Sequence, residues 1–316
     1  MVWSLWRHFV RYRDIEFARP MWVDLVRPAA DFMVQFRDPD SKLPLPSYDL
    51  WEERYGVHAF TVASVYGGLT SAQRFAQCFG DPKRAQKYGQ AAAEIQDAFG
   101  RYMWSDGRGR FLRRITPRDG DRTARLMEDV FAGRTPRPTG QRGFEDMVDP
   151  AEKRAAAPPE PVEVAYEADD NIDASMFAIF ALGLLPVDDP RVAATMQKIE
   201  ERLTVKTDVG GVARYEDDYY HQVTDDVENV PGNPWFICTL WMADYRIAKA
   251  QTPAELKEAA SYLEWVAARA LPSGVLAEQV HPTTNDPLSV SPLTWSHATV
   301  VATVVSYLNK LDALSG

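Results

Sequence analysis

Apolar residues recur every three or four positions along most of the chain, which is the period of an amphipathic helix. Proline and capping residues divide this pattern into segments of ordinary helix length, as at Asp188-Asp189-Pro190. Helices are predicted at residues 2–12, 20–36, 57–79, 82–103, 173–184, 190–203, 234–250, 253–270 and 292–311. No alternating run is long enough for a major sheet, so the pattern predicts an all-α fold built from helical hairpins.

Two of the predicted helices carry distinctive residues. Near the N-terminus, Trp3, Trp6 and Phe9 recur at helical spacing, which favours a core helix over a targeting peptide. Within the helix at 57–79, Gly67-Gly68 indicates close packing against another helix, because glycine carries no side chain. Both helices are therefore expected to contribute to the core.

Residues 116–164 break the helical pattern. They contain Arg- and Pro-rich and acidic pieces, and their apolar residues lack a period. Such composition is typical of a long inserted loop, mobile in part. One short helix is predicted within it, near residues 122–132.

Charge and cysteine content narrow the functional classes. Lys and Arg number 35 against 45 Asp and Glu, a net charge of −10, which argues against nucleic acid as a partner. No apolar stretch is long enough to cross a bilayer as a helix, and no secretory signal is recognised. Cys78 and Cys238 lie in apolar runs and are predicted to be buried and reduced. The sequence therefore predicts a cytoplasmic protein without membrane attachment, metal or cofactor.

Four segments place acids or amides next to aromatic or apolar residues between the predicted helices: Ser47–Arg54, Arg214–Tyr220, Gly232–Phe236 and Ala277–Val280. Each alone has an ordinary interpretation: a helix start, a solvated loop, a Pro-started core helix and a surface loop. Together they favour carbohydrate chemistry, since glycoside hydrolysis needs two carboxyl groups flanking one bond. The protonated acid needs a raised pKa, which Trp51 as an apolar wall, or Asp49 and Glu53 as like charges, could supply.

These segments resemble glycoside hydrolase family 15, which includes glucoamylase-, glucodextranase- and trehalase-like enzymes. The matching segments occur in the family's order: Pro46–Glu53, Asp173–Ser175, Arg214–Glu216, Gly232–Trp235, Ala277–Gln279 and Pro292–Ser296. The resemblance implies an (α/α)6 barrel and an inverting, exo-acting attack on α-glucosidic bonds that releases β-D-glucose.

The resemblance also assigns roles to individual residues. It implies that Glu52 is the general acid and Glu278 the general base. Inversion needs room for a water molecule, so the two carboxyl groups are expected about 6.5–9.5 Å apart. The positions that resemble sugar-lining positions of the family are Leu50, Trp51, Glu53, Arg214 and Trp235.

The chain departs from the family in its helix count, with about nine helices where the barrel has twelve. Residues 1–316 are therefore expected to be a single barrel domain, truncated at the N-terminus, and to lack the segment that grips the terminal glucose. Exposed apolar faces, including the stripe of Trp3, Trp6 and Phe9, would then favour self-association or contact with a missing N-terminal segment.

Alternative functions stay open at this point. The expected substrate is an α-linked gluco-oligosaccharide, with isomalto-oligosaccharides and trehalose as alternatives. A second class of function is an inactive or regulatory interaction protein that keeps the scaffold.

Overall fold

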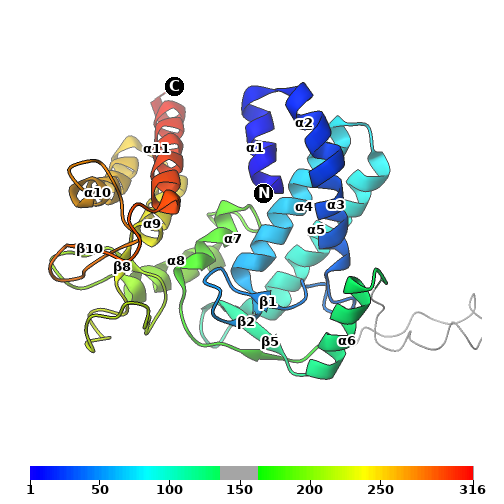
Figure 1. The fold of residues 1–316 in the computed structure, drawn as a ribbon, viewed down its shortest axis with the longest axis horizontal. Coiled ribbons are helices and arrows are strands. Elements are labelled where there is room, and N and C mark those ends of the chain that lie inside the picture. The colour runs from blue at the N-terminus through cyan, green and yellow to red at the C-terminus, as the bar shows by residue number, and fades with distance from the viewer. Residues whose placement is uncertain (136–162, 316) are drawn as a thin grey trace, which may run out of the picture. The chain divides into compact units, whose positions relative to one another are not determined.

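The computed structural model describes residues 1–135 and 163–315, most of which lie in helices joined by turns and short strands (Figure 1). The chain divides into two compact units, each described here by itself. Unit 1 consists of Met1–Met103 with Arg114–Asp169, and unit 2 of Trp104–Arg113 with Asp170–Gly316.

Unit 1 is mainly helical. Its helices are α1 (Val2–Tyr12), α2 (Ile15–Met21), α3 (Arg27–Gln35), α4 (Ala59–Cys78), α5 (Pro82–Met103) and α6 (Gly120–Phe131), with a π-helical turn, η1 (Trp22–Val26), between α2 and α3. Three starts are capped by aspartates: Asp14 accepts a hydrogen bond from the Phe17 N–H, Asp81 accepts one from the Arg84 N–H, and Asp119 accepts one from the Arg122 N–H.

The core of unit 1 forms where α4 meets its neighbours (Figure 1). From α1, the rings of Trp6 and Phe9 lie 5.1 and 5.7 Å from the ring of Phe75 on α4. The expectation that this stripe is exposed is wrong for Phe9, which is buried, because α4 supplies the apolar partner. The close packing predicted at Gly67-Gly68 is confirmed, since a Cβ on Gly68 would lie 2.9 Å from the Met33 sulfur.

Four short antiparallel strands form the sheet of unit 1, in the order β1 (Ser47–Tyr48), β2 (Tyr55–His58), β5 (Arg114–Pro117) and β6 (Tyr166–Ala168). Strands β1 and β2 form a hairpin in which Ser47 faces Gly56 and Tyr48 faces Tyr55. Residues 49–54, which carry the first acidic segment, form its loop.

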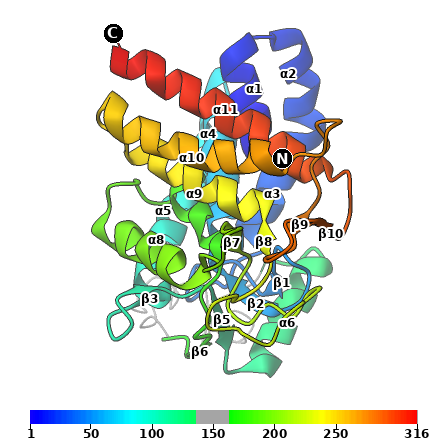
Figure 2. The ribbon, with the colours of Figure 1, turned by 90° about the vertical axis from the view of Figure 1, so that its left-hand side faces the viewer.

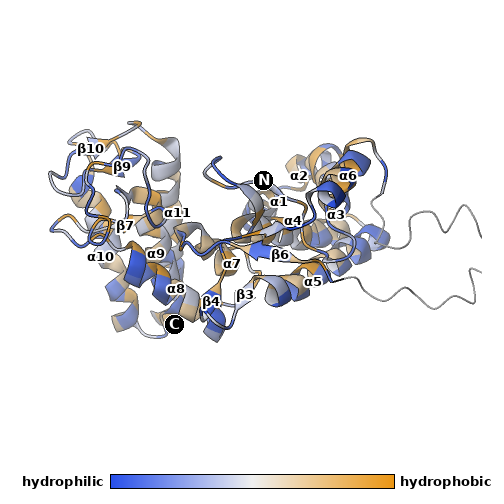
Figure 3. Cartoon of the chain, turned by 90° about the horizontal axis from the view of Figure 1, so that it is seen from below, coloured by the Kyte–Doolittle hydropathy of each residue, from blue (hydrophilic) through white to orange (hydrophobic). Residues whose placement is uncertain are grey.

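Unit 2 contains the remaining helices: η3 (Ala174–Phe177), α7 (Ala178–Ala181), α8 (Pro190–Leu203), α9 (Phe236–Lys249), α10 (Pro253–Arg269) and α11 (Thr294–Ser315). Helices α9, α10 and α11 pack side by side (Figure 2). Hydrophilic and hydrophobic residues share the surface of α8 (Figure 3), whose buried positions repeat every three or four residues from Val192 to Leu203. This spacing buries one face of the helix.

A second antiparallel sheet in unit 2 has the order β10 (Pro287–Leu288), β9 (Gln279–Val280), β8 (Pro234–Trp235) and β7 (Val212–Ala213). Trp235 faces Val212 on one side and Gln279 on the other. A separate hairpin joins β3 (Trp104–Ser105) to β4 (Arg110–Phe111). Strands β7, β8 and β9 of this four-stranded sheet come from segments far apart in sequence, so the sheet brings these segments together.

Most predicted helices are confirmed, with shifted ends that have local causes. The helix expected at 20–36 starts at Ile15, because Asp14 caps it. The helix expected from 57 starts at Ala59, because Tyr55–His58 forms β2. The segment 173–184 is helical only over Ala174–Ala181.

Of the predicted insertion at 116–164, the short helix is confirmed as α6, and residues 136–162 lie outside the described residues. The prediction that Cys78 is buried is wrong, because it lies on the exposed side of the last turn of α4, whereas Cys238 is buried. Among the residues described here, no helix has both the length and the apolarity to cross a membrane.

Candidate active site

The proposed general acid, Glu52, lies on the hairpin loop of unit 1 rather than at a helix start, so the helix-start interpretation of this segment is wrong. The loop is closed by main-chain hydrogen bonds from Asp49 N–H to Arg54 O (2.9 Å) and from Glu52 N–H to Asp49 O (3.2 Å). Glu52 has φ 60°, in the left-handed region that non-glycine residues rarely adopt. Its side chain is exposed.

The neighbours of Glu52 in the loop are held by polar contacts. The Asp49 carboxylate accepts a hydrogen bond from the Glu53 N–H at 2.8 Å. Glu53 in turn pairs with Arg54 at 3.2 Å, so its charge is compensated locally. Leu50 and Trp51 are half-buried. The loop therefore gathers all four predicted residues of unit 1 around a defined backbone turn.

In unit 2, Arg214 follows β7 directly and is buried. Its guanidinium is surrounded by one carboxylate and three aromatic rings, which together are called the cage around Arg214. Its Nε and Nη2 atoms donate to the two carboxylate oxygens of Asp218 at 3.0 and 2.8 Å. Nη2 also donates to the Tyr215 hydroxyl at 2.9 Å. The guanidinium carbon lies 4.6 to 5.2 Å from the ring centres of Tyr215, Tyr220 and Trp235. Two-point pairing and three aromatic faces leave the guanidinium little freedom.

Gly232 allows the segments Arg214–Tyr220 and Gly232–Phe236 to pack closely against each other. A Cβ on Gly232 would lie 2.7 Å from the Asp218 Cβ, which real Cβ atoms do not tolerate. Glycine at this position lets the chain pass close to Asp218 before it enters β8, where Trp235 meets Arg214. The segment Gly232–Trp235 is thus fitted to the Arg214–Asp218 pair.

The proposed general base, Glu278, lies immediately before β9 and is half-buried. Its Oε2 atom accepts a hydrogen bond from the Ser289 hydroxyl at 2.5 Å and a longer one from Gln279 Nε2 at 3.4 Å. Its main chain is fixed on both sides: its N–H donates to Val290 O at 2.9 Å, and its carbonyl accepts from the Phe236 N–H at 3.4 Å.

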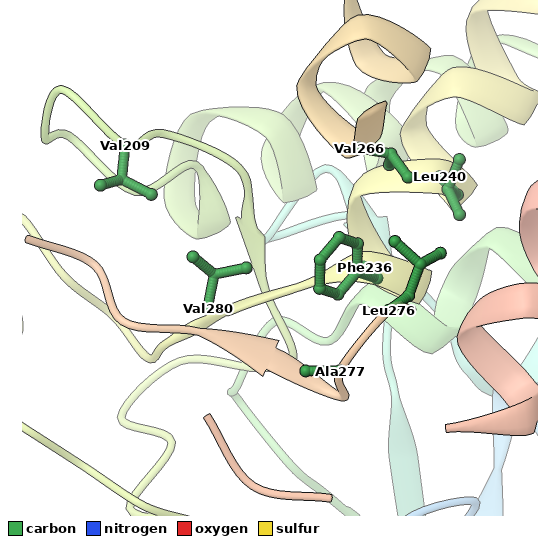
Figure 4. Packing of buried hydrophobic residues seen from close by; sticks show 7 residues of the cluster. All are labelled: Val209, Phe236, Leu240, Val266, Leu276, Ala277 and Val280. Atoms are coloured by element: carbon green, nitrogen blue, oxygen red, sulfur yellow. The ribbon is translucent and has the colours of Figure 1, made fainter. Parts of the chain in front are cut away.

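A hydrophobic cluster anchors the segment that carries Glu278 (Figure 4). Leu276 and Ala277 before the glutamate and Val280 after it are buried in this cluster with Phe236, the first residue of α9. Burying these side chains removes apolar area from water on both sides of Glu278. The cluster therefore anchors the chain on both sides of Glu278.

The sheet of unit 2 brings together Arg214, Trp235 and Glu278, three residues singled out from separate segments of the sequence. Sequence reasoning gave no role to four side chains that support them: Asp218, Asn233, Gln279 and Ser289. Asp218 and Asn233 lie inside segments already noted, but nothing in the sequence marks Ser289. Across the described residues, no three His, Cys, Asp or Glu side chains are placed to hold a metal ion.

Several solved glycosidases resemble this chain in structure. A bacterial glucoamylase complexed with acarbose matches with a TM-score of 0.64 at 21% identity, over 92% of this chain and 38% of that one. A wild-type glycosidase matches with a TM-score of 0.63 at 20% identity, over 97% of this chain and 64% of that one. The chain has the fold of this helical class of glycosidase, and the predicted all-α, (α/α)6-barrel fold class is confirmed.

Sequence comparison identifies the family. A sequence profile of the glycosyl hydrolases family 15 matches residues 40–305, so the chain belongs to this family. It is 25% identical over 311 residues to an uncharacterized glycosyl hydrolase of Methanocaldococcus jannaschii, covering 93% of this chain and 39% of that protein. It is 26% identical over 297 residues to a glucoamylase of a Clostridium species, covering 89% of this chain and 35% of that protein. A trehalase of Mycolicibacterium smegmatis is 29% identical over 137 residues, or 43% of this chain and 19% of that protein.

Proposed function

We propose that the chain hydrolyses α-glucosidic bonds by an inverting, exo-acting mechanism that releases β-D-glucose. The observation that carries this proposal is the sheet of unit 2, whose neighbouring strands hold Arg214, Trp235 and Glu278 on adjacent segments. A carboxylate, an indole and a guanidinium carried on adjacent segments suit a sugar, because the ring faces of sugars are apolar and their hydroxyls bond to charged groups. Family membership supports the same chemistry.

In the proposed reaction, Glu52 donates its proton to the glycosidic oxygen as the bond to the anomeric carbon breaks. Glu278 removes a proton from a water molecule, whose oxygen bonds to the anomeric carbon from the opposite face. The proton of Glu52 ends on the leaving sugar, and one proton of water ends on Glu278. Leu50, Trp51, Glu53, Arg214 and Trp235 are proposed to line the sugar sites.

The substrate class follows from the relatives only as far as a glucosyl group. One relative is named glucoamylase, two are named trehalase, and one similar structure contains acarbose. We therefore propose α-linked gluco-oligosaccharides, first of the α-1,4 type, with isomalto-oligosaccharides and trehalose as the alternatives.

The test is to incubate the purified chain with maltooligosaccharides, isomalto-oligosaccharides and trehalose and to measure released glucose. Proton NMR taken early in the reaction should detect the β-anomer first. A Gln222→Glu variant, altered at an exposed position, should keep full activity, whereas Glu278→Gln should lose it. Release of the α-anomer first would contradict inversion. No release from any substrate by the folded chain would instead favour an inactive or regulatory protein on a glycosidase scaffold.

Three further expectations from the sequence stay predictions. Residues 1–316 are proposed to form one domain, with residues 116–164 as an insertion. The cytoplasmic location and the expectation of self-association are likewise proposals. Gel filtration of the purified chain would test self-association directly.

A further inference from the structure

Two buried side-chain amides lie in series behind Glu278. Asn233 is 1% exposed and Gln279 is fully buried, so neither amide exchanges its partners for water readily. Asn233 Nδ2 donates to the main-chain carbonyl of His221 at 2.8 Å and to Gln279 Oε1 at 2.9 Å. Gln279 Nε2 then donates to Glu278 Oε2 at 3.4 Å. The series joins a loop carbonyl to the carboxylate through three hydrogen bonds.

The direction of these hydrogen bonds is fixed by the chemistry of their donors and acceptors. The His221 carbonyl can only accept, so the Asn233 atom that faces it must be the nitrogen. The second proton of that nitrogen points at Gln279, which must therefore present its oxygen. The Gln279 amide is left with its nitrogen facing Glu278, so a donor always faces the carboxylate.

The two carboxylate oxygens of Glu278 differ in their hydrogen bonds. Oε2 accepts from Gln279 Nε2 and from the Ser289 hydroxyl. Among the described residues, no hydrogen bond reaches Oε1. The carboxylate is thus held by one oxygen, and the other is available to a water molecule.

We propose that Asn233 is a positioning residue for the general base, acting through the amide of Gln279 so that Oε1 of Glu278 faces the attacking water. This inference rests on the proposed role of Glu278. Replacing Asn233 by aspartate would reverse the series, because a carboxylate cannot donate to the His221 carbonyl. The Gln279 amide would then turn its nitrogen toward residue 233 and its oxygen toward Glu278. That oxygen would repel the carboxylate of Glu278.

The first test is spectroscopic and needs no activity. In protein labelled with 15N-glutamine, the Gln279 side-chain signal is the one that disappears in Gln279→Met. Changing Glu278 to Gln should move this signal, because the charge of its acceptor is removed. In a protein that already carries Asn233→Asp, Glu278→Gln should leave the chemical shift of the Gln279 side-chain signal unchanged. An equal displacement in both backgrounds would overturn the proposal. If the aspartate variant does not fold, the kinetic comparison of Gln279→Met with the unsubstituted chain, described next, decides in its place.

The second test is kinetic. Asn233→Asp and Gln279→Met should lower kcat roughly tenfold or more and leave KM nearly unchanged, since orientation of the base matters only in the transition state. Gln222→Glu makes the same amide-to-acid change at an exposed position of the same loop and should alter neither parameter. A rise in KM with kcat unchanged would contradict the positioning role. A positive spectroscopic result in a chain that hydrolyses no glucoside would uphold the amide series and reject the proposed function.

Discussion

The two proposed catalytic acids lie in regions that are built in opposite ways. Glu278 is half-buried and is held through its side chain by Ser289 and Gln279, next to a buried apolar cluster. Glu52 is exposed, and its place is defined by the backbone of a hairpin loop in the left-handed conformation. One acid is positioned by its neighbours, whereas the other is positioned by the turn that carries it.

This contrast matches the different tasks proposed for the two residues. A general base must hold one orientation toward a small water molecule, which suits a carboxylate fixed by hydrogen bonds. A general acid must reach the leaving oxygen of substrates with different leaving sugars, which suits a side chain on a loop. The contrast can be tested on both sides.

The largest expected effect separates the two roles by leaving group. On a maltooligosaccharide, Glu52→Gln and Glu278→Gln should each lower kcat by roughly 10²–10⁴-fold. On α-glucosyl fluoride, Glu52→Gln should lose far less, because fluoride leaves with little help from an acid, whereas Glu278→Gln should lose activity on both substrates. Steady-state rates on the two substrates measure this directly.

Two outcomes would break the assignment. Equal losses for Glu52→Gln on both substrates would exclude a general-acid role for that residue. Retention of activity by Glu278→Gln on either substrate would show that another group serves as the base. The exposed variant Gln222→Glu is the control for general effects of substitution on activity.

The next largest effect is on stability in unit 2. Asp218 and Arg214 are both buried, and removal of Asp218 takes away the two-point pairing of the buried guanidinium. Asp218→Ala should therefore lower the free energy of unfolding by about 3–5 kcal/mol in urea titrations. Asp217→Asn removes an exposed acid next to it and should cost little. A small loss for Asp218→Ala would show that the cage around Arg214 does not depend on the ion pair.

The helices of this chain could be predicted from sequence because their signals are local. Helix α8 shows this: Asp189 accepts a hydrogen bond from the Arg191 N–H, Pro190 begins the helix, and the buried positions repeat at helical spacing. The strands could not be predicted in the same way. Strands of two to four residues are too short to display alternation, and acids beside Trp51 are equally typical of a helix start.

The sequence proposed residues for the candidate site but did not indicate the side chains that support them. Arg214, Trp235 and Glu278 were found through a resemblance to a family, since each segment alone has an ordinary interpretation. Nothing in the run from Glu216 to Asp218 marks the last acid as the buried partner of Arg214. Ser289 reaches Glu278 only through the fold, because β9 and β10 pair between them.

A smaller effect concerns Asp244, a half-buried acid of α9 that, unlike Asp218, forms no ion pair within the part of the chain that the structure describes. Among the described residues, Oδ1 of Asp244 is buried without a hydrogen-bond partner. Burial raises the pKa of Asp244 from 3.8 to about 6, although the Thr303 hydroxyl acts in the opposite direction. The folded state therefore binds the Asp244 proton more tightly than the unfolded state does. The stabilisation that comes from this proton is full below pH 3.8 and is lost as the pH rises through about 6.

Asp244→Asn should therefore raise the free energy of unfolding by about 3 kcal/mol at pH 7.5 and by only about 0.5 kcal/mol at pH 4. Thermal unfolding at the two pH values measures the difference. Asp312→Asn, at an exposed position of α11, should show no such dependence. A gain of equal size at both pH values would mean that ionisation of Asp244 is not its cause.

The smallest expected effect is on the free energy of unfolding when residues of the hairpin loop of unit 1 are changed. A non-glycine residue in the left-handed region costs about 1–2 kcal/mol, and glycine loses about 0.5–1 kcal/mol in chain entropy on folding. Glu52→Gly should therefore abolish activity and yet raise the free energy of unfolding by up to about 1 kcal/mol. Glu53→Gly, one residue further on, has no left-handed backbone to relieve and loses its pairing with Arg54, so it should be less stable. If both variants lose stability alike, the backbone at residue 52 is not strained, and the hairpin loop does not position the acid at a cost to the fold.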